Sequence, residues 1–172
     1  MNKQLYLFVA LLFPVLLSAQ EWKTYKDSAY FTVKYPAAWT QTTDEKKRTL
    51  LTSPSDGPGD PFAENVNISV TKNENYGTKT KIRDIFPSVT DNLKKNFREF
   101  KLETQRYFQW NNTEACEIIY TGYSGTDDHK FRIIQWFCFY KKRLYTVSFT
   151  TLDINLTHTA NAKKILRSII FK

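Results

Sequence analysis

Two cysteines and two histidines have the most reactive side chains in this 172-residue chain. Cys116 and Cys138 lie in two segments that are typical of β-strands, joined by a turn near Thr126–Asp127. An antiparallel hairpin with that turn places the two cysteines nearly opposite each other. In an oxidising compartment they can pair, and we favour a cross-strand disulfide over two separate buried thiols. A catalytic role is disfavoured, because Cys138 lies in an apolar strand with no histidine near it in sequence.

The same turn carries Asp127-Asp128-His129, two carboxylates and an imidazole, which are possible ligands of a divalent metal. Three adjacent residues do not easily converge on one ion. An aspartate at a turn also has an ordinary structural role, because its side chain accepts hydrogen bonds from nearby backbone N–H groups. The other histidine, His158, is expected to be exposed at the start of a C-terminal helix.

Motifs of the common hydrolases and nucleotide-binding proteins are missing from the sequence: Gly-x-Ser-x-Gly, His-Glu-x-x-His and the P-loop. Asp56 and Asp60, in the loop PSDGPGDPF, resemble a calcium-binding loop only loosely, since the ligand pattern of such a loop does not follow. We therefore predict a protein that is not an enzyme, with no catalytic residue, no cofactor and no metal site.

These side chains need a scaffold, and the sequence predicts an antiparallel one. The stretch Thr113–Thr151 consists of three consecutive strand-like segments, TEACEIIYTGY, KFRIIQWFCFY and RLYTVSFTT. The middle segment is apolar on both faces, so we expect it to be covered on both sides within a sheet. Further strands are predicted at 21–25, 30–35, 40–43, 48–53, 65–72 and 100–110.

Two segments show apolar residues at spacings of three and four, which predicts amphipathic helices. The first is Ile82–Phe97, where Pro87 is expected to kink the helix or to split it. The second is Thr157–Ser168, with Thr157 or Thr159 as the N-cap residue. Together these elements predict one α+β domain over residues 21–172, an antiparallel β-sheet flanked by helices.

The N-terminus has the layout of a secretory signal peptide over residues 1–20. Lys3 is followed by an apolar run and then by small and polar residues, with cleavage expected after Ala19 or Gln20. An uncleaved anchor is the alternative. No cysteine follows the cleavage point, so we do not expect a lipoprotein. The sequence predicts a periplasmic or secreted protein with no transmembrane segment after cleavage.

The formal net charge of +8 permits binding to anionic partners. Short basic runs of this kind are also common in solvated turns. The 13 Phe, 10 Tyr and 4 Trp could stack on bases or sugars, but they are expected to fill the core, and no nucleic-acid partner is predicted. The residues proposed to contact anionic partners are Lys46, Lys47, Arg48, Lys141, Lys142 and Arg143.

The segment YFTVKYPAAW, Tyr30–Trp39, resembles the opening motif of the PsbP-like family, which includes DcrB-like exported bacterial proteins. In that motif an alternating strand leads into Tyr-Pro, with Trp three residues later, as at Tyr35, Pro36 and Trp39. The order of the later elements is similar as well. The resemblance implies a compact antiparallel sheet flanked by helices, and roles in binding and assembly rather than catalysis.

We therefore predict a non-enzymatic binding or accessory domain of the bacterial cell envelope, whose partner is an envelope protein or an anionic polymer. The expected contact surface is the loop Pro54–Phe62, with Asp56, Asp60 and Phe62, because loops on a rigid sheet often carry binding. The first alternative is a basic surface that binds anionic envelope polymers or lipid headgroups. The second is a hydrolase-type enzyme. The ligand and the oligomeric state stay open.

Overall fold

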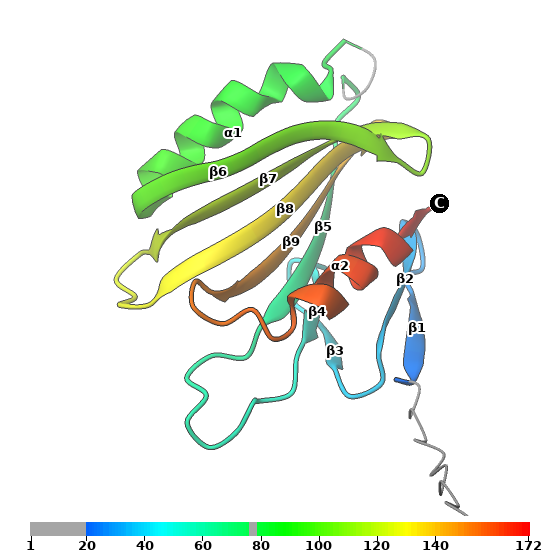
Figure 1. The fold of residues 1–172 in the computed structure, drawn as a ribbon. Coiled ribbons are helices and arrows are strands. Elements are labelled where there is room, and N and C mark those ends of the chain that lie inside the picture. Colours follow the sequence, from blue (N-terminus) through cyan, green and yellow to red (C-terminus); the bar gives the residue numbers. More distant parts are fainter. Residues whose placement is uncertain (1–19, 76–78) are drawn as a thin grey trace, which may run out of the picture.

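The computed structural model describes residues 20–75 and 79–172, and it has the predicted α+β fold (Figure 1). Most strands belong to a seven-stranded antiparallel sheet with the order β3-β4-β5-β9-β8-β7-β6. The sheet contains β3 (Thr40–Thr43), β4 (Thr49–Thr52), β5 (Asn65–Lys72), β6 (Phe97–Trp110), β7 (Thr113–Ser124), β8 (Lys130–Tyr140) and β9 (Arg143–Leu152).

The predicted meander is confirmed as β7-β8-β9, and β8 is covered on both faces. Phe131, Ile133 and Phe137 are buried in one apolar cluster on one face of β8. Trp136 and Cys138 are buried in another cluster on the opposite face. The sheet therefore separates two cores, as the two-sided apolar pattern of this strand predicted.

Helix α1 (Ile82–Asn96) covers one face of the sheet over β6, β7 and β8 (Figure 1). Its first turn is fixed by the Asp84 carboxylate, which accepts a hydrogen bond from the Lys81 N–H at 2.7 Å. The helix runs through Pro87, so the predicted alternative of a split does not occur. Phe97 ends the helix and begins β6 directly, three residues earlier than the sequence suggested.

The other face is covered by helix α2 (Thr159–Ser168) and by a second, three-stranded sheet (Figure 1). His158 is the N-cap residue, so the predicted caps Thr157 and Thr159 are wrong. The predicted apolar stripe of α2 is confirmed, since Ala162, Ile165 and Leu166 are fully buried. The small sheet has the order β1-β2-β10 and consists of β1 (Trp22–Lys26), β2 (Phe31–Pro36) and β10 (Ile170–Phe171).

The predicted disulfide between Cys116 and Cys138 is wrong, because both cysteines are free and buried. Cys138 pairs with Ala115, and Cys116 pairs with Phe137. This offset of one residue turns the two thiols toward opposite faces of the sheet. Burial raises the pKa of the Cys116 thiol to about 11 and also raises the pKa of the Cys138 thiol. The alternative of two separate buried thiols therefore holds.

The predicted signal peptide falls almost entirely on residues 1–19, which lie outside the described residues, so it stays a prediction. Within residues 20–75 and 79–172, no helix has the length and apolar character that crossing a bilayer requires.

Candidate functional site

The loop Pro54–Phe62 leaves the sheet between β4 and β5 and extends away from it (Figure 1). Asp60 fixes its shape, since the two carboxylate oxygens accept the Asp56 N–H at 2.9 Å and the Phe62 N–H at 3.2 Å. The hydrogen bond from the Asp56 N–H, and then that from Phe62, hold the pKa of the Asp60 carboxyl below its ordinary value. Asp60 thus folds the loop internally.

Phe62 anchors the other end of the loop. Its ring lies against the Phe131 ring, with 5.1 Å between the centroids. It also borders an open groove of about 560 Å³ on the sheet face that carries α1. Amide and hydroxyl side chains of β5 and β9 line this groove, namely Asn65, Asn67, Ser148 and Thr150. Phe62, at the end of the loop, therefore borders a groove with both apolar and polar lining.

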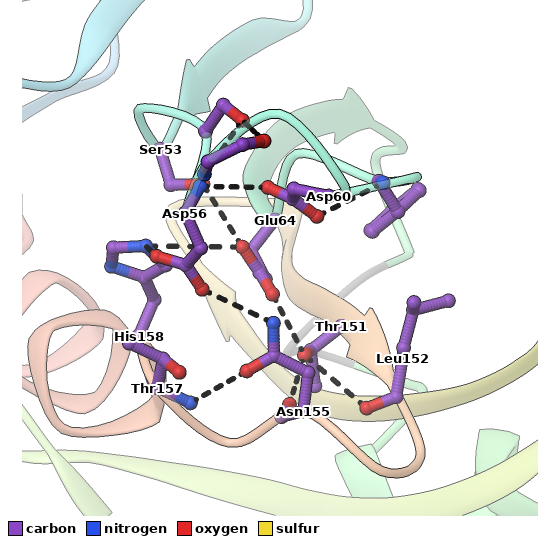
Figure 2. A network of polar contacts seen from close by, with 12 residues as sticks. Ser53, Asp56, Asp60, Glu64, Thr151, Leu152, Asn155, Thr157 and His158 are labelled. Atoms are coloured by element: carbon purple, nitrogen blue, oxygen red, sulfur yellow. Dashed lines mark hydrogen bonds and ion pairs between the residues drawn. The ribbon is translucent and has the colours of Figure 1, made fainter.

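The side chain of Asp56 lies beside the start of α2, where it meets Glu64 and His158 (Figure 2). The Nε2 atom of His158 is 3.0 Å from Asp56 Oδ1 and 4.0 Å from Glu64 Oε2. One ligand atom from each of the three residues lies within 4.8 Å of the other two. The His158 side chain is only 11% exposed, so the expectation of an exposed histidine was wrong.

Glu64 is fully buried, and its carboxylate has few donors. Ser53 Oγ donates to Oε2 at 3.0 Å. Thr151 Oγ1 is 3.3 Å from Oε1, but it is 2.5 Å from the backbone oxygen of Asn155, and a hydroxyl has a single hydrogen to donate. Among the described residues, His158 is the only basic group within 4.0 Å of the Glu64 carboxylate. This carboxylate is therefore poorly compensated for a group removed from water.

Two further side chains fix the geometry of the cluster. The Asn155 amide donates to Asp56 Oδ2 at 3.2 Å, and its oxygen accepts the Thr157 N–H at 3.0 Å (Figure 2). The Trp39 ring meets the His158 ring edge-on, with 5.7 Å between the centroids. Asn155 thus connects the loop to the segment between β9 and α2, and Trp39 packs against the N-cap residue of α2.

The sequence interpretation included Asp56 and His158 separately and missed Glu64. A signal for Glu64 exists in the pattern of β5. Val66 and Ile68 alternate on the buried face of the strand, and one further step back along the same alternation reaches Glu64. Glutamate is rarely fully buried unless its carboxylate is paired. A glutamate on the buried face of a strand is therefore a candidate for a functional residue.

The acidic turn that first suggested a metal stays a local structure. His129 Nδ1 is 2.9 Å from Asp127 Oδ1, and both side chains are largely exposed. The same oxygen accepts the His129 N–H at 2.8 Å. Within the described part of the chain, the group of three metal-capable side chains is that of Asp56, Glu64 and His158, and it includes none of the turn residues.

The six basic residues lie on or directly beside two different turns, β3–β4 and β8–β9, and Arg143 is the first residue of β9. Arg48 is paired with Asp44 at 2.6 Å, and Lys142 with Glu74 at 2.9 Å. The Arg143 guanidinium lies over the Tyr30 ring, 5.2 Å from its centroid. Acidic and aromatic neighbours therefore already interact with part of this positive charge. The remaining predicted contact residues, Lys46, Lys47 and Lys141, are exposed.

Comparison with solved structures shows the same fold at low sequence identity. A Pseudomonas aeruginosa protein of unknown function, PA94, described as a candidate regulator, has a TM-score of 0.61 and 18% identity, covering 87% of this chain and 96% of its own. CyanoP from Synechocystis sp. PCC 6803 has a TM-score of 0.60 and 11% identity, covering 91% and 95%. LpqN of Mycobacterium tuberculosis, described as involved in cell envelope biogenesis, has a TM-score of 0.56 and 12% identity, covering 88% and 91%.

No curated protein matches the sequence. The model of the PsbP-like protein family does match, over residues 15–172. This range includes every element of the fold and every residue of the cluster around His158. The resemblance carried by Tyr30–Trp39 is thereby confirmed, and the chain belongs to the PsbP-like protein family.

Proposed function

We propose that this protein is an exported, non-enzymatic binding or accessory protein of the bacterial cell envelope. The family, the similarity to LpqN and the N-terminal signal-peptide pattern support this proposal. The observation that carries it is the surface around the loop Pro54–Phe62. Loops held by a rigid sheet are the usual place for binding.

This surface exposes large apolar side chains next to a hollow. Ile154 is 93% exposed and Leu156 is 56% exposed, and both lie in the segment between β9 and α2. Ile154 borders a hollow of about 440 Å³, whose other lining residues are Asp56, Gly57, Pro58, Gly59, Asp60, Pro61, Leu152 and Asn155. Exposed apolar residues beside a shaped hollow are typical of contact sites for other molecules.

The polar cluster gives this surface a fixed shape. Asn155 connects the segment that carries Ile154 to Asp56 of the loop, and Asp60 folds the loop internally. A binding surface that is already ordered loses less conformational entropy when its partner arrives. The cluster therefore supports a role in recognition.

The hydrogen bonding of the cluster also supports a role other than hydrolysis. In a serine hydrolase the histidine accepts the proton of the nucleophilic hydroxyl. Here the Ser53 hydroxyl donates to Glu64, and the His158 ring faces Asp56. The hydroxyl and the imidazole are thus engaged with different carboxylates.

Site-specific photo-crosslinking in the native host tests the proposal. A photoreactive phenylalanine analogue replaces Ile154 in one strain and Lys95, which is exposed on α1, in a control strain. We expect a discrete adduct in the envelope fraction from position 154 and none from position 95. Absence of an adduct at 154, or the same adduct from both positions, would contradict the assignment.

An anionic polymer or lipid headgroup is the second candidate partner, supported by the net charge of +8. Lys46 and Lys47 are exposed on the β3–β4 turn. Binding of this kind weakens steeply as salt is added. Salt-insensitive binding to anionic vesicles, or none, would leave the loop surface as the site of recognition.

A further inference from the structure

We propose that Asp56, Glu64 and His158 form a site for a divalent transition-metal ion of the Zn²⁺ type. The site departs from the sequence-based expectation that the chain has no metal ligands. It does not depend on the partner of the loop surface, although Asp56 belongs to both.

The donor atoms have the arrangement that such a site needs. Zn²⁺ binds nitrogen and carboxylate oxygen at roughly 2.0–2.2 Å, so two of its ligand atoms lie at most about 4.4 Å apart. His158 Nε2 is 3.0 Å from Asp56 Oδ1 and 4.0 Å from Glu64 Oε2, and one ligand atom from each of the three side chains lies within 4.8 Å of the other two. The bound of 4.8 Å exceeds this limit by only about 0.4 Å.

The electrostatics of the cluster favour a cation. Glu64 is fully buried, and within the described ranges its only basic neighbour in ion-pair distance is the His158 ring at 4.0 Å. Asp56 adds a second carboxylate beside the same ring. A buried carboxylate is stable when it is paired or when it coordinates a metal. A divalent ion between the two carboxylates supplies that compensation.

The donor set selects the class of metal. Imidazole nitrogen suits Zn²⁺ and neighbouring first-row ions, whereas Mg²⁺ and Ca²⁺ prefer oxygen ligands alone. Three protein ligands leave a position for water or for an oxygen of a partner molecule. The ligands come from the loop, from the residue before β5 and from the N-cap of α2, so the ion joins three separate segments.

Direct binding measurements on the untagged mature protein, stripped with EDTA, test the site. Calorimetric titration with Zn²⁺ is expected to show one ion per chain. His158→Gln is expected to lower the affinity by at least the roughly 10–100-fold that loss of a supporting residue costs in metal sites. The matched control is His129→Gln, which removes the other histidine, also paired with an aspartate, and should leave the affinity unchanged.

Co²⁺ provides a readout that a purely structural role would not give. The wild type and His129→Gln are expected to show the visible absorption of Co²⁺ in a protein site, and His158→Gln is expected to lack it. Circular dichroism confirms that each variant is folded, and Asp56→Asn replaces His158→Gln if the latter is not. No binding by the wild type, equal binding by His158→Gln, or equal loss in His129→Gln would overturn the proposal.

Discussion

Two regions of this protein place a histidine beside an aspartate, and they differ in how the residues come together. On the β7–β8 turn, His129 and Asp127 are two positions apart and largely exposed. In the loop cluster, His158 and Asp56 are 102 positions apart, and fully buried Glu64 lies 4.0 Å from the same ring. In the sequence the turn was the more obvious candidate for a metal site, but in the three-dimensional structure the loop cluster is the better candidate.

The difference shows what burial adds to a histidine–carboxylate contact. At the exposed turn, water surrounds both side chains and the His129 N–H satisfies the Asp127 carboxylate, so a ligand has little to gain there. In the cluster, water is excluded from Glu64 and few protein donors replace it. A ligand can therefore gain more from the buried group than from the exposed one.

The largest expected effect is thermal stabilisation by Zn²⁺. At a free concentration about 100 times the dissociation constant, binding to the native state is expected to raise the melting temperature by about 5–10 °C. Asp56→Asn should abolish most of this shift, because it replaces a charged carboxylate ligand with a neutral amide, which binds Zn²⁺ much more weakly. Asp127→Asn is the control from the turn and should keep it. If Asp56→Asn kept the shift in melting temperature and Asp127→Asn lost it, the metal would bind at the turn and not at the loop cluster.

A smaller effect is expected for Glu64→Gln in EDTA. The amide can accept from Ser53 and donate to Thr151 Oγ1, because the Thr151 hydroxyl has the backbone oxygens of Leu152 and Asn155 as other acceptors. The carboxylate is thus replaced without loss of packing. We expect the free energy of unfolding in urea to stay equal or to rise by about 1 kcal/mol. A clear loss of stability would show that the ionised carboxylate is already well compensated without a metal.

The smallest effect concerns pH, and here the two regions should behave alike. The pKa of the Asp60 carboxyl is lowered mainly by a hydrogen bond from the Asp56 N–H. The pKa of the Asp127 carboxyl is lowered mainly by a hydrogen bond from the His129 N–H. Because the folded pKa lies below the unfolded one, each carboxylate stabilises the fold above the ordinary value of 3.8, and this contribution is lost as the pH falls through the folded pKa.

Melting temperatures between about pH 6 and pH 2 check this expectation. Asp60→Asn and Asp127→Asn should each lie slightly below the wild type at neutral pH, and both differences should shrink as the solution becomes acidic. A difference that grows with acidity for either variant would mean that its carboxyl is not stabilised in the ionised form.

Much of the scaffold could be predicted from the sequence because its patterns are local. The alternation in Asn65–Lys72 matches β5 residue for residue, and the spacing of apolar residues predicted α1 and the buried stripe of α2. The second sheet was missed, because β10 pairs with β2 from the opposite end of the chain. Short apolar segments contain no information about such a distant partner.

Whether the two cysteines can form a disulfide depends on which face of the sheet each side chain points to. The hairpin was located well enough to place Cys116 and Cys138 almost opposite each other, yet one residue of offset turned their thiols to different faces. Sequence patterns locate a turn to within a residue or two, and a disulfide depends on that last residue.

By itself, the sequence determined the α+β class, the central meander and the loop Pro54–Phe62, because periodicity and turn residues act over short stretches of chain. Only the tertiary structure brought Asp56 and Glu64 to His158, since their meeting depends on how α2 packs against the sheet. The same packing excluded water from Glu64. Convergence and burial are properties of the folded chain, and they turn three ordinary polar residues into a candidate site.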